Sequence, residues 1–330
     1  LPSVPVLAEP GDELGEGLGA VADGVLLARA ELAEGFVVIG GDEERVVAEA
    51  FRADLGLAKD APLDETIDAA IHHITEDVAV EIAGAAGSDS GADVALITRG
   101  GYGLTRLLPA IKYKHIAKAI ARGTQFVGLS DFTAFNQAVY AKTERISWQG
   151  PALGEDFGPS QEPDDIMQAC FDDLLLEQGE GTGWQLPKAE AERRVLVKDA
   201  PLWGGNLAVL TSLLGTPYFP QVKGGVLFLE DVGEHPYRIE RMLTQLLHAG
   251  VLTRQKAVLM GQFTNYKLVP AHDKGFRLAT VVEWLRSQIK APVLTGLPFG
   301  HVETKVLLPV GAKVDLVTEG RDALMVWGHI

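Results

Sequence analysis

The chain has 330 residues, of which 47% are hydrophobic, and its formal net charge is −16 at pH 7. This length is enough for two domains of ordinary size, and the hydrophobic content excludes a disordered chain. A surface this acidic repels phosphate backbones and anionic lipids, so neither a nucleic acid nor a membrane surface is expected as a partner.

The cellular location is predicted from three features. No apolar run approaches the roughly 18–20 residues that span a bilayer, and residues 1–5 lack the basic-then-apolar pattern of a secretory signal. The single cysteine, Cys170, cannot form an internal disulfide, and its setting at helical spacing predicts a buried packing residue rather than a nucleophile. Together these features predict a cytoplasmic protein.

The N-terminal half alternates short apolar runs with amphipathic stretches. Strands are predicted over 25–27, 37–40, 94–98 and 125–129; helices are predicted over 63–85 and 107–122, with another beginning at Asp131. Alternation of strand and helix predicts a parallel sheet covered on both faces. Ligands of such sheets bind at the carboxyl ends of the strands.

The second half differs in character. Glycine and proline punctuate a polar stretch from 150 to 194 that carries one predicted helix, 164–177. Beyond it, strands are predicted over 225–229, 257–260 and 305–308, and helices over 206–214, 237–249 and 278–289. We therefore predict an N-terminal α/β domain over 1–160, a linker with one helix over 161–194, and a C-terminal domain over 195–330.

The first candidate for chemistry is the segment 128–133, Gly-Leu-Ser-Asp-Phe-Thr. Ser130 falls in the turn between a strand and a helix, where its hydroxyl would project above the sheet edge. The backbone N–H of Asp131 would lie at the helix N-terminus, ready to donate to an oxyanion. The alternative is an ordinary helix N-cap, and Phe132 stands where the second glycine of G-x-S-x-G belongs.

A glycine-rich loop follows the strand 94–98, with the sequence Arg-Gly-Gly-Tyr-Gly over 99–103. Three glycines in four positions let a backbone approach a ligand closely. A phosphate-cradling loop, an oxyanion-side loop and a plain tight turn all fit this pattern, although neither G-x-G-x-x-G nor a P-loop is completed.

Two further segments carry a carboxylate pair and a histidine. Glu230 and Asp231 end the apolar strand 225–229, either as solvated residues or as the partner that orients a histidine. His301 ends the loop 296–301 and could act as a base near neutral pH, with His235 as a competitor. The pair His72-His73 lies in a predicted helix and is a poor metal site, and no H-E-x-x-H occurs, so no metal or cofactor is expected.

Taken together, these segments resemble the LD-carboxypeptidases, a family that acts on murein tetrapeptides. The matching stretches are 99–103 with 106–108, 128–134, 202–207, 214–217, 229–232, 234–243 and 296–301. They cover about residues 94–312 and are densest in 200–310, while in the first ninety residues only 52–55 matches. The resemblance implies a flavodoxin-like parallel-sheet N-terminal domain plus a smaller mixed α/β C-terminal domain, with the active site between them.

The resemblance also implies roles for individual residues. The nucleophile falls on Ser130, the triad acid on Glu230 rather than Asp231, and the base on His301. The oxyanion donors would be the backbone amides of Asp131 and Gly101. The implied enzyme removes the C-terminal D-alanine from murein tetrapeptides in peptidoglycan recycling, without metal or cofactor, and family members are often homodimers.

Two alternatives stay open at this point. A microcin-immunity-type serine peptidase, which cleaves peptidyl or aminoacyl nucleotides, would share the triad and differ in its substrate pocket. A non-catalytic α/β domain that binds an anion with the glycine loop belongs to a different class, and covalent reaction of Ser130 with a fluorophosphonate would exclude it.

Overall fold

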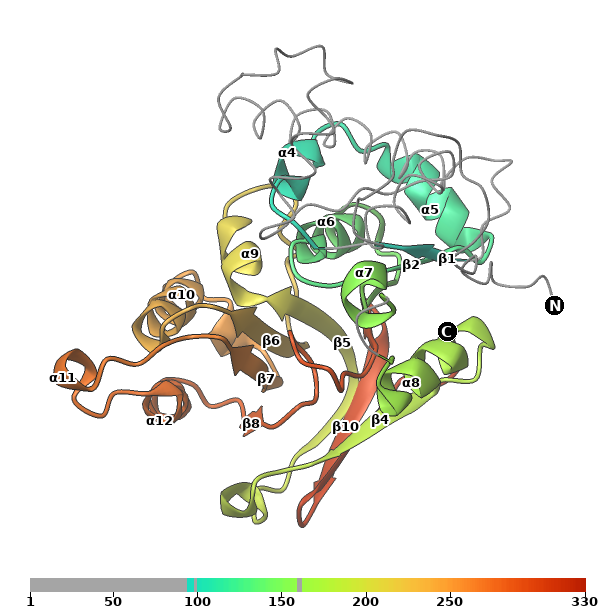
Figure 1. Ribbon diagram of the computed structural model, residues 1–330. Coiled ribbons are helices and arrows are strands. Elements are labelled where there is room, and N and C mark those ends of the chain that lie inside the picture. Colours follow the sequence, from blue (N-terminus) through green and yellow to red (C-terminus); the bar gives the residue numbers. More distant parts are fainter. Residues whose placement is uncertain (1–93, 98–99, 159–161) are drawn as a thin grey trace.

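The computed structural model describes residues 94–97, 100–158 and 162–330 (Figure 1). The strands predicted over 25–27 and 37–40, the helix over 63–85 and its pair His72-His73 lie outside the described residues. Within the described ranges, the strands form a four-stranded and a seven-stranded sheet. The predicted α/β class is confirmed, with parallel strands in both sheets and helices packed against them.

The first sheet combines the middle of the chain with its C-terminal part. Its strands, in spatial order, are β1 (Val94–Leu96), β2 (Gln125–Gly128), β3 (Ser147–Gln149) and β9 (Leu308–Val310). The first three are parallel, and β9 pairs antiparallel with β3, Trp148 facing Pro309. A strand from the predicted C-terminal domain thus completes the sheet that carries the Ser130 turn.

Three helices accompany this sheet: α4 (Leu104–Leu107), α5 (Tyr113–Ala121) and α6 (Phe132–Thr143). The single helix predicted over 107–122 is wrong, because the chain turns between α4 and α5. Pro109 has no N–H to continue the helical ladder, and the amides of Ala110 and Ile111 both donate to the Leu107 carbonyl instead. This turn places α5 beside α6, which α5 contacts.

The second sheet is mixed. Its strands, in spatial order, are β4 (Gly181–Gln185), β11 (Asp322–Val326), β10 (Lys313–Glu319), β5 (Leu196–Asn206), β6 (Val226–Val232), β7 (Ala257–Thr264) and β8 (Val293–Thr295). The strands from β5 to β8 are parallel, whereas β4, β11 and β10 pair antiparallel. The connecting helices are α9 (Leu207–Ser212), α10 (Pro236–His248), α11 (Pro270–Asp273) and α12 (Leu278–Gln288). Figure 1 shows β5 and β10 extending together away from the helices as one long ribbon.

Two segments differ from the sequence prediction. The stretch predicted as a linker contains the expected helix, α8 (Asp165–Leu175), but also β4, which pairs with β11 at the sheet edge. A short helix, α7 (Leu153–Asp156), precedes this stretch. The strand predicted over 305–308 is wrong, because strand pairing begins at Leu308. Lys305 instead forms a buried ion pair with Asp156, and the Val306 amide donates to the Pro298 carbonyl. The domain boundaries themselves remain a prediction.

The hydrophobic core brings the segments of interest together. Leu129, directly after β2, is buried in the same cluster as Phe228 of β6 and Phe299 of the 296–301 loop. The rings of Phe228 and Phe299 meet edge to face at 5.4 Å between centroids. The residue before Ser130 and the residue two before His301 are therefore anchored in one core. In the described part of the chain, no helix is long and apolar enough to cross a membrane.

Candidate active site

Ser130 occupies a strained turn between β2 and α6. Its φ of 61° lies in the left-handed region, which an L-residue other than glycine adopts at a cost of about 1–2 kcal/mol. The turn is held by hydrogen bonds from the Phe132 amide to the Leu129 carbonyl (3.1 Å) and from the Thr133 amide to the Ser130 carbonyl (2.9 Å). The N-cap position belongs to Asp131, whose side chain makes no capping hydrogen bond. The alternative reading of Ser130 as an ordinary N-cap is therefore wrong, and strain of this kind is typical of functional positions.

The glycine loop packs directly against this turn. A Cβ atom added to Gly100 would lie 2.2 Å from the Leu129 carbonyl oxygen and 2.6 Å from Cβ of Ser130. Gly101 is exposed, and a Cβ added to it would have no neighbour within 4 Å. Of the two glycines, Gly100 therefore contacts the Ser130 turn and Gly101 is open to solvent. Arg99, the first residue of this loop, lies outside the described residues.

Glu230 and His301 form a hydrogen-bonded pair. Glu230 is fully buried near the end of β6, and its Oε2 lies 2.9 Å from Nδ1 of His301. Gly300 permits this approach: its φ is 139°, and an added Cβ would lie 3.2 Å from Cβ of Glu230. Because the carboxylate accepts at Nδ1, the proton of a neutral imidazole is held there, and Nε2 is left with a free lone pair. This is the arrangement of a general base oriented by an acid.

The electrostatic surroundings of His301 favour its charged form. Burial by itself lowers the pKa of His301, but the hydrogen bond and the charge of Glu230 outweigh burial and raise it above its ordinary value. Glu155 adds to the rise, and Lys305 opposes it. An imidazole that gains a proton readily is suited to take one from a hydroxyl.

Asp231 faces a different set of partners. Its Oδ2 accepts from the Ala208 amide at 3.0 Å, and its Oδ1 accepts from the Val232 amide at 2.9 Å. Burial, followed by the neighbouring charge of Glu230, raises the pKa of Asp231 to about 7. Of the two adjacent carboxylates, the structure therefore brings Glu230, not Asp231, to the histidine.

Asn206 is a residue of this site that sequence reasoning missed. It ends β5 and is buried, and its Nδ2 lies 3.1 Å from Oε1 of Glu230 and 3.1 Å from Oδ1 of Asp231. Its backbone amide donates to Oγ1 of Thr133 at 3.0 Å. A hydrogen-bonded path thus runs from α6, three residues after Ser130, to the Glu230–His301 pair. The signal in the sequence was an asparagine at a strand end before a helix, which is also the pattern of a common N-cap.

The structure does not bring every candidate to this site. His235 caps α10 through its Nδ1, and its Nε2 lies 3.2 Å from Asp273. Cys170 is half-buried and packs against two clusters of the hydrophobic core, one that contains Phe228 and one that contains Trp148. Burial raises the pKa of its thiol. Among the described residues, the Ser130 hydroxyl makes no hydrogen bond to His301; such contacts often form only when substrate is bound. In the same ranges no group of three or more His, Cys, Asp or Glu could hold a metal ion.

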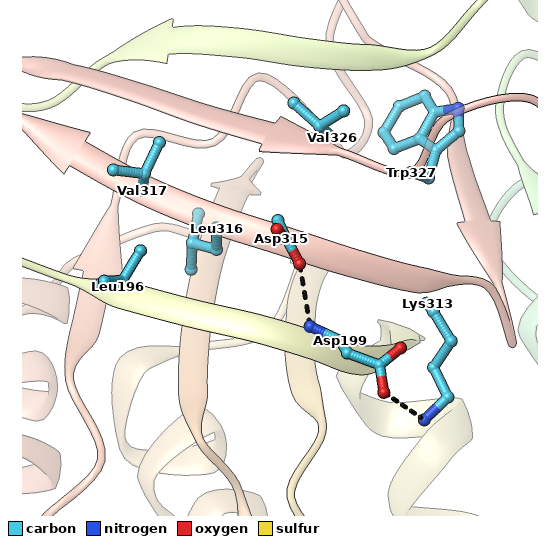
Figure 2. Close-up of a pocket in the computed structure, with 8 residues that line it drawn as sticks. All are labelled: Leu196, Asp199, Lys313, Asp315, Leu316, Val317, Val326 and Trp327. Carbon is cyan, nitrogen blue, oxygen red and sulfur yellow. Dashed lines mark hydrogen bonds and ion pairs between the residues drawn. The ribbon is translucent and has the colours of Figure 1, made fainter.

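A groove of about 550 Å³ lies elsewhere, on the outer face of β5, β10 and β11 (Figure 2). Its walls include Leu196, Val317 and Val326, with the weak ion pair of Lys313 and Asp199 at one end. None of the predicted site residues lines it. The buried pair of Glu230 and His301 is thus separate from the groove.

Comparison with known proteins identifies relatives of both halves. The LD-carboxypeptidase N-terminal domain matches residues 65–150, and the LD-carboxypeptidase C-terminal domain matches residues 199–316. A probable murein peptide carboxypeptidase of Bacillus subtilis is 32% identical over 230 residues, 68% of this chain and 69% of the relative. The microcin C7 self-immunity protein MccF of Escherichia coli is 26% identical over 242 residues, 66% of this chain and 69% of the relative.

A solved structure agrees with these matches. The muramoyltetrapeptide carboxypeptidase from Oxalobacter formigenes superimposes with a TM-score of 0.69 at 38% identity, covering 77% of this chain and 85% of the other. Structures of MccF also superimpose, with a TM-score of 0.64 at 23% identity, a similarity that concerns the fold alone. From the two domain matches and the relatives above 30% identity, we conclude that this chain belongs to the LD-carboxypeptidase family of peptidases.

Proposed function

We propose that this protein is a serine LD-carboxypeptidase that removes the C-terminal D-alanine from murein tetrapeptides. The observation that carries the proposal is the 2.9 Å contact between buried Glu230 and His301, combined with the strained turn at Ser130. Relatives with murein-peptide names support the substrate class. In this proposal Ser130 is the nucleophile, His301 the base and Glu230 the acid of a triad.

The reaction would proceed by acyl transfer. Nε2 of His301 takes the Ser130 proton while Oγ forms a bond to the carbonyl carbon of the L-centre at the third residue. The carbonyl oxygen becomes an oxyanion, to which the backbone amides of Asp131 and Gly101 donate. The intermediate collapses with cleavage of the C–N bond, and His301 gives its proton to the nitrogen of the departing D-alanine.

Hydrolysis of the ester would complete the cycle. Water gives a proton to Nε2 of His301 as its oxygen attacks the acyl carbon, and the same two amides again hold the oxyanion. The bond to Oγ then breaks, and His301 returns the proton to Ser130. The products are a tripeptide carboxylate and D-alanine, with the enzyme unchanged. No step requires an oxidant, a reductant or a metal ion.

One experiment tests reaction and substrate together. A murein tetrapeptide is incubated with the wild-type protein and with Ser130→Ala, and the products are followed by mass spectrometry. The proposal expects loss of one alanine residue with the wild type and none with the variant. An intact tetrapeptide in both samples, with wild-type protein that is folded by circular dichroism, would contradict it.

The second candidate function is cleavage of an aminoacyl or peptidyl nucleotide. The similarity to MccF favours it, because both kinds of enzyme could use the same serine, acid and base. Parallel assays with a murein tetrapeptide and an aminoacyl nucleotide would separate them. A kcat/KM at least about tenfold higher for the nucleotide would favour the second candidate. The predicted cytoplasmic location and homodimer would be tested by cell fractionation and by light scattering.

A further inference from the structure

Asn206 uses every polar atom of its buried side chain. Its Oδ1 accepts from the Val209 amide at 3.1 Å, capping α9, while Nδ2 donates to Glu230 and to Asp231. This orientation of the amide follows from chemistry: reversed, Oδ1 would face two carboxylates and Nδ2 would face an N–H. The two hydrogens of one NH₂ group therefore lie between two adjacent carboxylates.

The same residue is fixed to the helix that follows Ser130. Its backbone amide donates to Oγ1 of Thr133, which also accepts from Nε2 of Gln149 at 3.0 Å. The preceding residue, Gly205, allows the close approach, since its φ is 137° and an added Cβ would lie 2.5 Å from the same Oγ1. The end of β5 thus contacts α6 directly at Asn206, the residue that also donates to the two carboxylates.

We propose that Asn206 is a positioning residue that holds the Glu230 carboxylate for His301 and ties it to the turn of Ser130. The inference rests on the proposed function and deepens it. Glu230 has one oxygen directed at His301 and the other at Asn206, so the amide fixes the rotation of the carboxylate. A fully buried carboxylate that lost one of these two partners would be left partly unpaired.

The neighbouring carboxyl of Asp231 is a second reason why Glu230 needs the Asn206 donor. It is a second buried carboxyl directly beside Glu230, and its own oxygens are held by the amides of Ala208 and Val232. The charge of Glu230 acts on Asp231, so the two side chains repel one another when both are ionised. Without the NH₂ group between them, that repulsion would move Glu230 away from the position from which it accepts at Nδ1.

A merely structural role for Asn206 is the competing explanation, because it also caps α9. Asn206→Ser separates the two roles: a serine hydroxyl can cap the helix but cannot bridge two carboxylates. We expect Asn206→Ser to remain folded but to unfold at a lower temperature than the wild type, because two buried carboxylates lose a donor. Its kcat should fall about 10–100-fold, with KM within about twofold. His235→Ser is the matched control. It changes the N-cap residue of α10, the helix after β6, in the same way and should leave kcat unchanged.

A double-mutant cycle tests whether Asn206 acts through Glu230. In a Glu230→Gln background, Asn206→Ser should lower kcat by less than about twofold, because the group that it positions is already altered. An equal fold-loss in both backgrounds would overturn the proposal. So would a wild-type kcat in folded Asn206→Ser.

Proton NMR gives a readout that needs no turnover. The Nδ1 proton of His301, shared with Glu230, should give a low-field resonance that moves upfield in Asn206→Ser and stays in place in His235→Ser. An unmoved resonance would count against the proposal. Ser130→Ala separates the two levels: if it is inactive while Asn206→Ser is fully active, only the role of Asn206 fails. If Ser130→Ala is active, the proposed function itself fails.

Discussion

A methyl group on Gly100 would lie 2.6 Å from Cβ of Ser130, closer than real side chains approach. The glycine loop therefore packs closely against the Ser130 turn at Gly100, where no side chain fits. Gly101, the proposed oxyanion donor, is the next residue.

Gly100→Ala should disrupt the turn, whereas Gly101→Ala should not. The added methyl group of Gly100→Ala meets a backbone carbonyl oxygen at 2.2 Å, so the loop or the turn must shift. We expect a loss of about 1–3 kcal/mol in the free energy of unfolding and a fall in kcat of at least about tenfold. Urea denaturation and tetrapeptide assays measure the two effects. Gly101→Ala keeps its N–H and enters open space, so equal damage from both variants would be inconsistent with this packing.

Two substitutions at Ser130 should separate the loss of the nucleophilic hydroxyl from the effect of backbone strain on stability. Both Ser130→Ala and Ser130→Gly lack the hydroxyl, so neither should turn over substrate or react with a fluorophosphonate. At a φ of 61° glycine avoids the cost that alanine bears, so Ser130→Gly should be the more stable of the two by about 1 kcal/mol. Chemical denaturation of both variants checks the order. Normal turnover by either folded variant would end the serine mechanism.

The pH dependence of kcat/KM should report on His301. A base must be neutral to accept a proton, so activity should rise with pH through the pKa of His301, which Glu230 raises above its ordinary value. Glu230→Gln removes that charge, and the acid limb should move to lower pH while kcat falls by at least about tenfold. The limb is measured from pH–rate profiles of both proteins.

His235→Ala is the control for the identity of the base. Its ring nitrogens serve the α10 cap and Asp273, so its loss should leave the acid limb where it is. An acid limb that follows His235 instead would reassign the base.

Asp231 should make stability depend on pH. Its pKa is about 7 in the folded protein, against 3.8 for an ordinary aspartate, so between these values the folded protein holds a proton that the unfolded chain has released. The stabilisation from this proton is complete below about pH 4 and is lost as the pH rises through about 7. Asp231→Asn cannot titrate, so its deficit in unfolding free energy should shrink as the pH rises from 4 to 7. A deficit that stays constant over this range would contradict the prediction.

The sequence anticipated the elements whose signal is local. Short apolar runs predicted the strands at 94, 125 and 257, and the helices predicted over 237–249 and 278–289 correspond to α10 and α12. The helix prediction over 107–122 failed because it followed the spacing of the apolar side chains, which continues across Pro109. The helix itself is interrupted there, because Pro109 lacks the N–H that the helical hydrogen bonds require. β4 was missed because its residues pair with a strand about 140 positions away, which no local pattern records.

The candidate site also combines features that the sequence could predict with features that depend on the tertiary structure. Ser130, Glu230 and His301 were candidates because each stands at a strand end or in a glycine-rich loop, and the resemblance to the LD-carboxypeptidases selected them, with Glu230 chosen over Asp231. The strained φ of Ser130 and the role of Asn206 depend on tertiary contacts that no local pattern records. Two adjacent carboxylates at a strand end look alike in sequence; the bulge between Leu229 and Asp231 in the pairing of β6 with β7 accompanies their divergence in space.

The stereochemistry of the substrate gives the sharpest test of the proposed activity. The proposed oxyanion donors are backbone amides of a fixed turn and loop, so a carbonyl cannot rotate to accommodate an inverted neighbour without leaving them. A leaving group of the wrong hand would press its methyl group into the wall that should face hydrogen, or turn its carboxylate away from its binding group. Rejection by a site built around a charged group can exceed the roughly 1–3 kcal/mol available from one methyl group.

We therefore expect a tetrapeptide ending in D-alanine to be cleaved at least about a hundredfold faster than its L-alanine epimer, a difference of about 2.7 kcal/mol in activation free energy. An intact pentapeptide should also resist, because its last bond joins two D-residues and its acyl centre is inverted. Values of kcat/KM for the three peptides, measured by release of alanine, decide the matter. Similar values for the D- and L-terminal tetrapeptides would remove the LD assignment. They would do so even if Ser130→Ala proved inactive, because the proposed triad accounts for the chemistry, whereas the stereochemical preference depends on the walls of the substrate site.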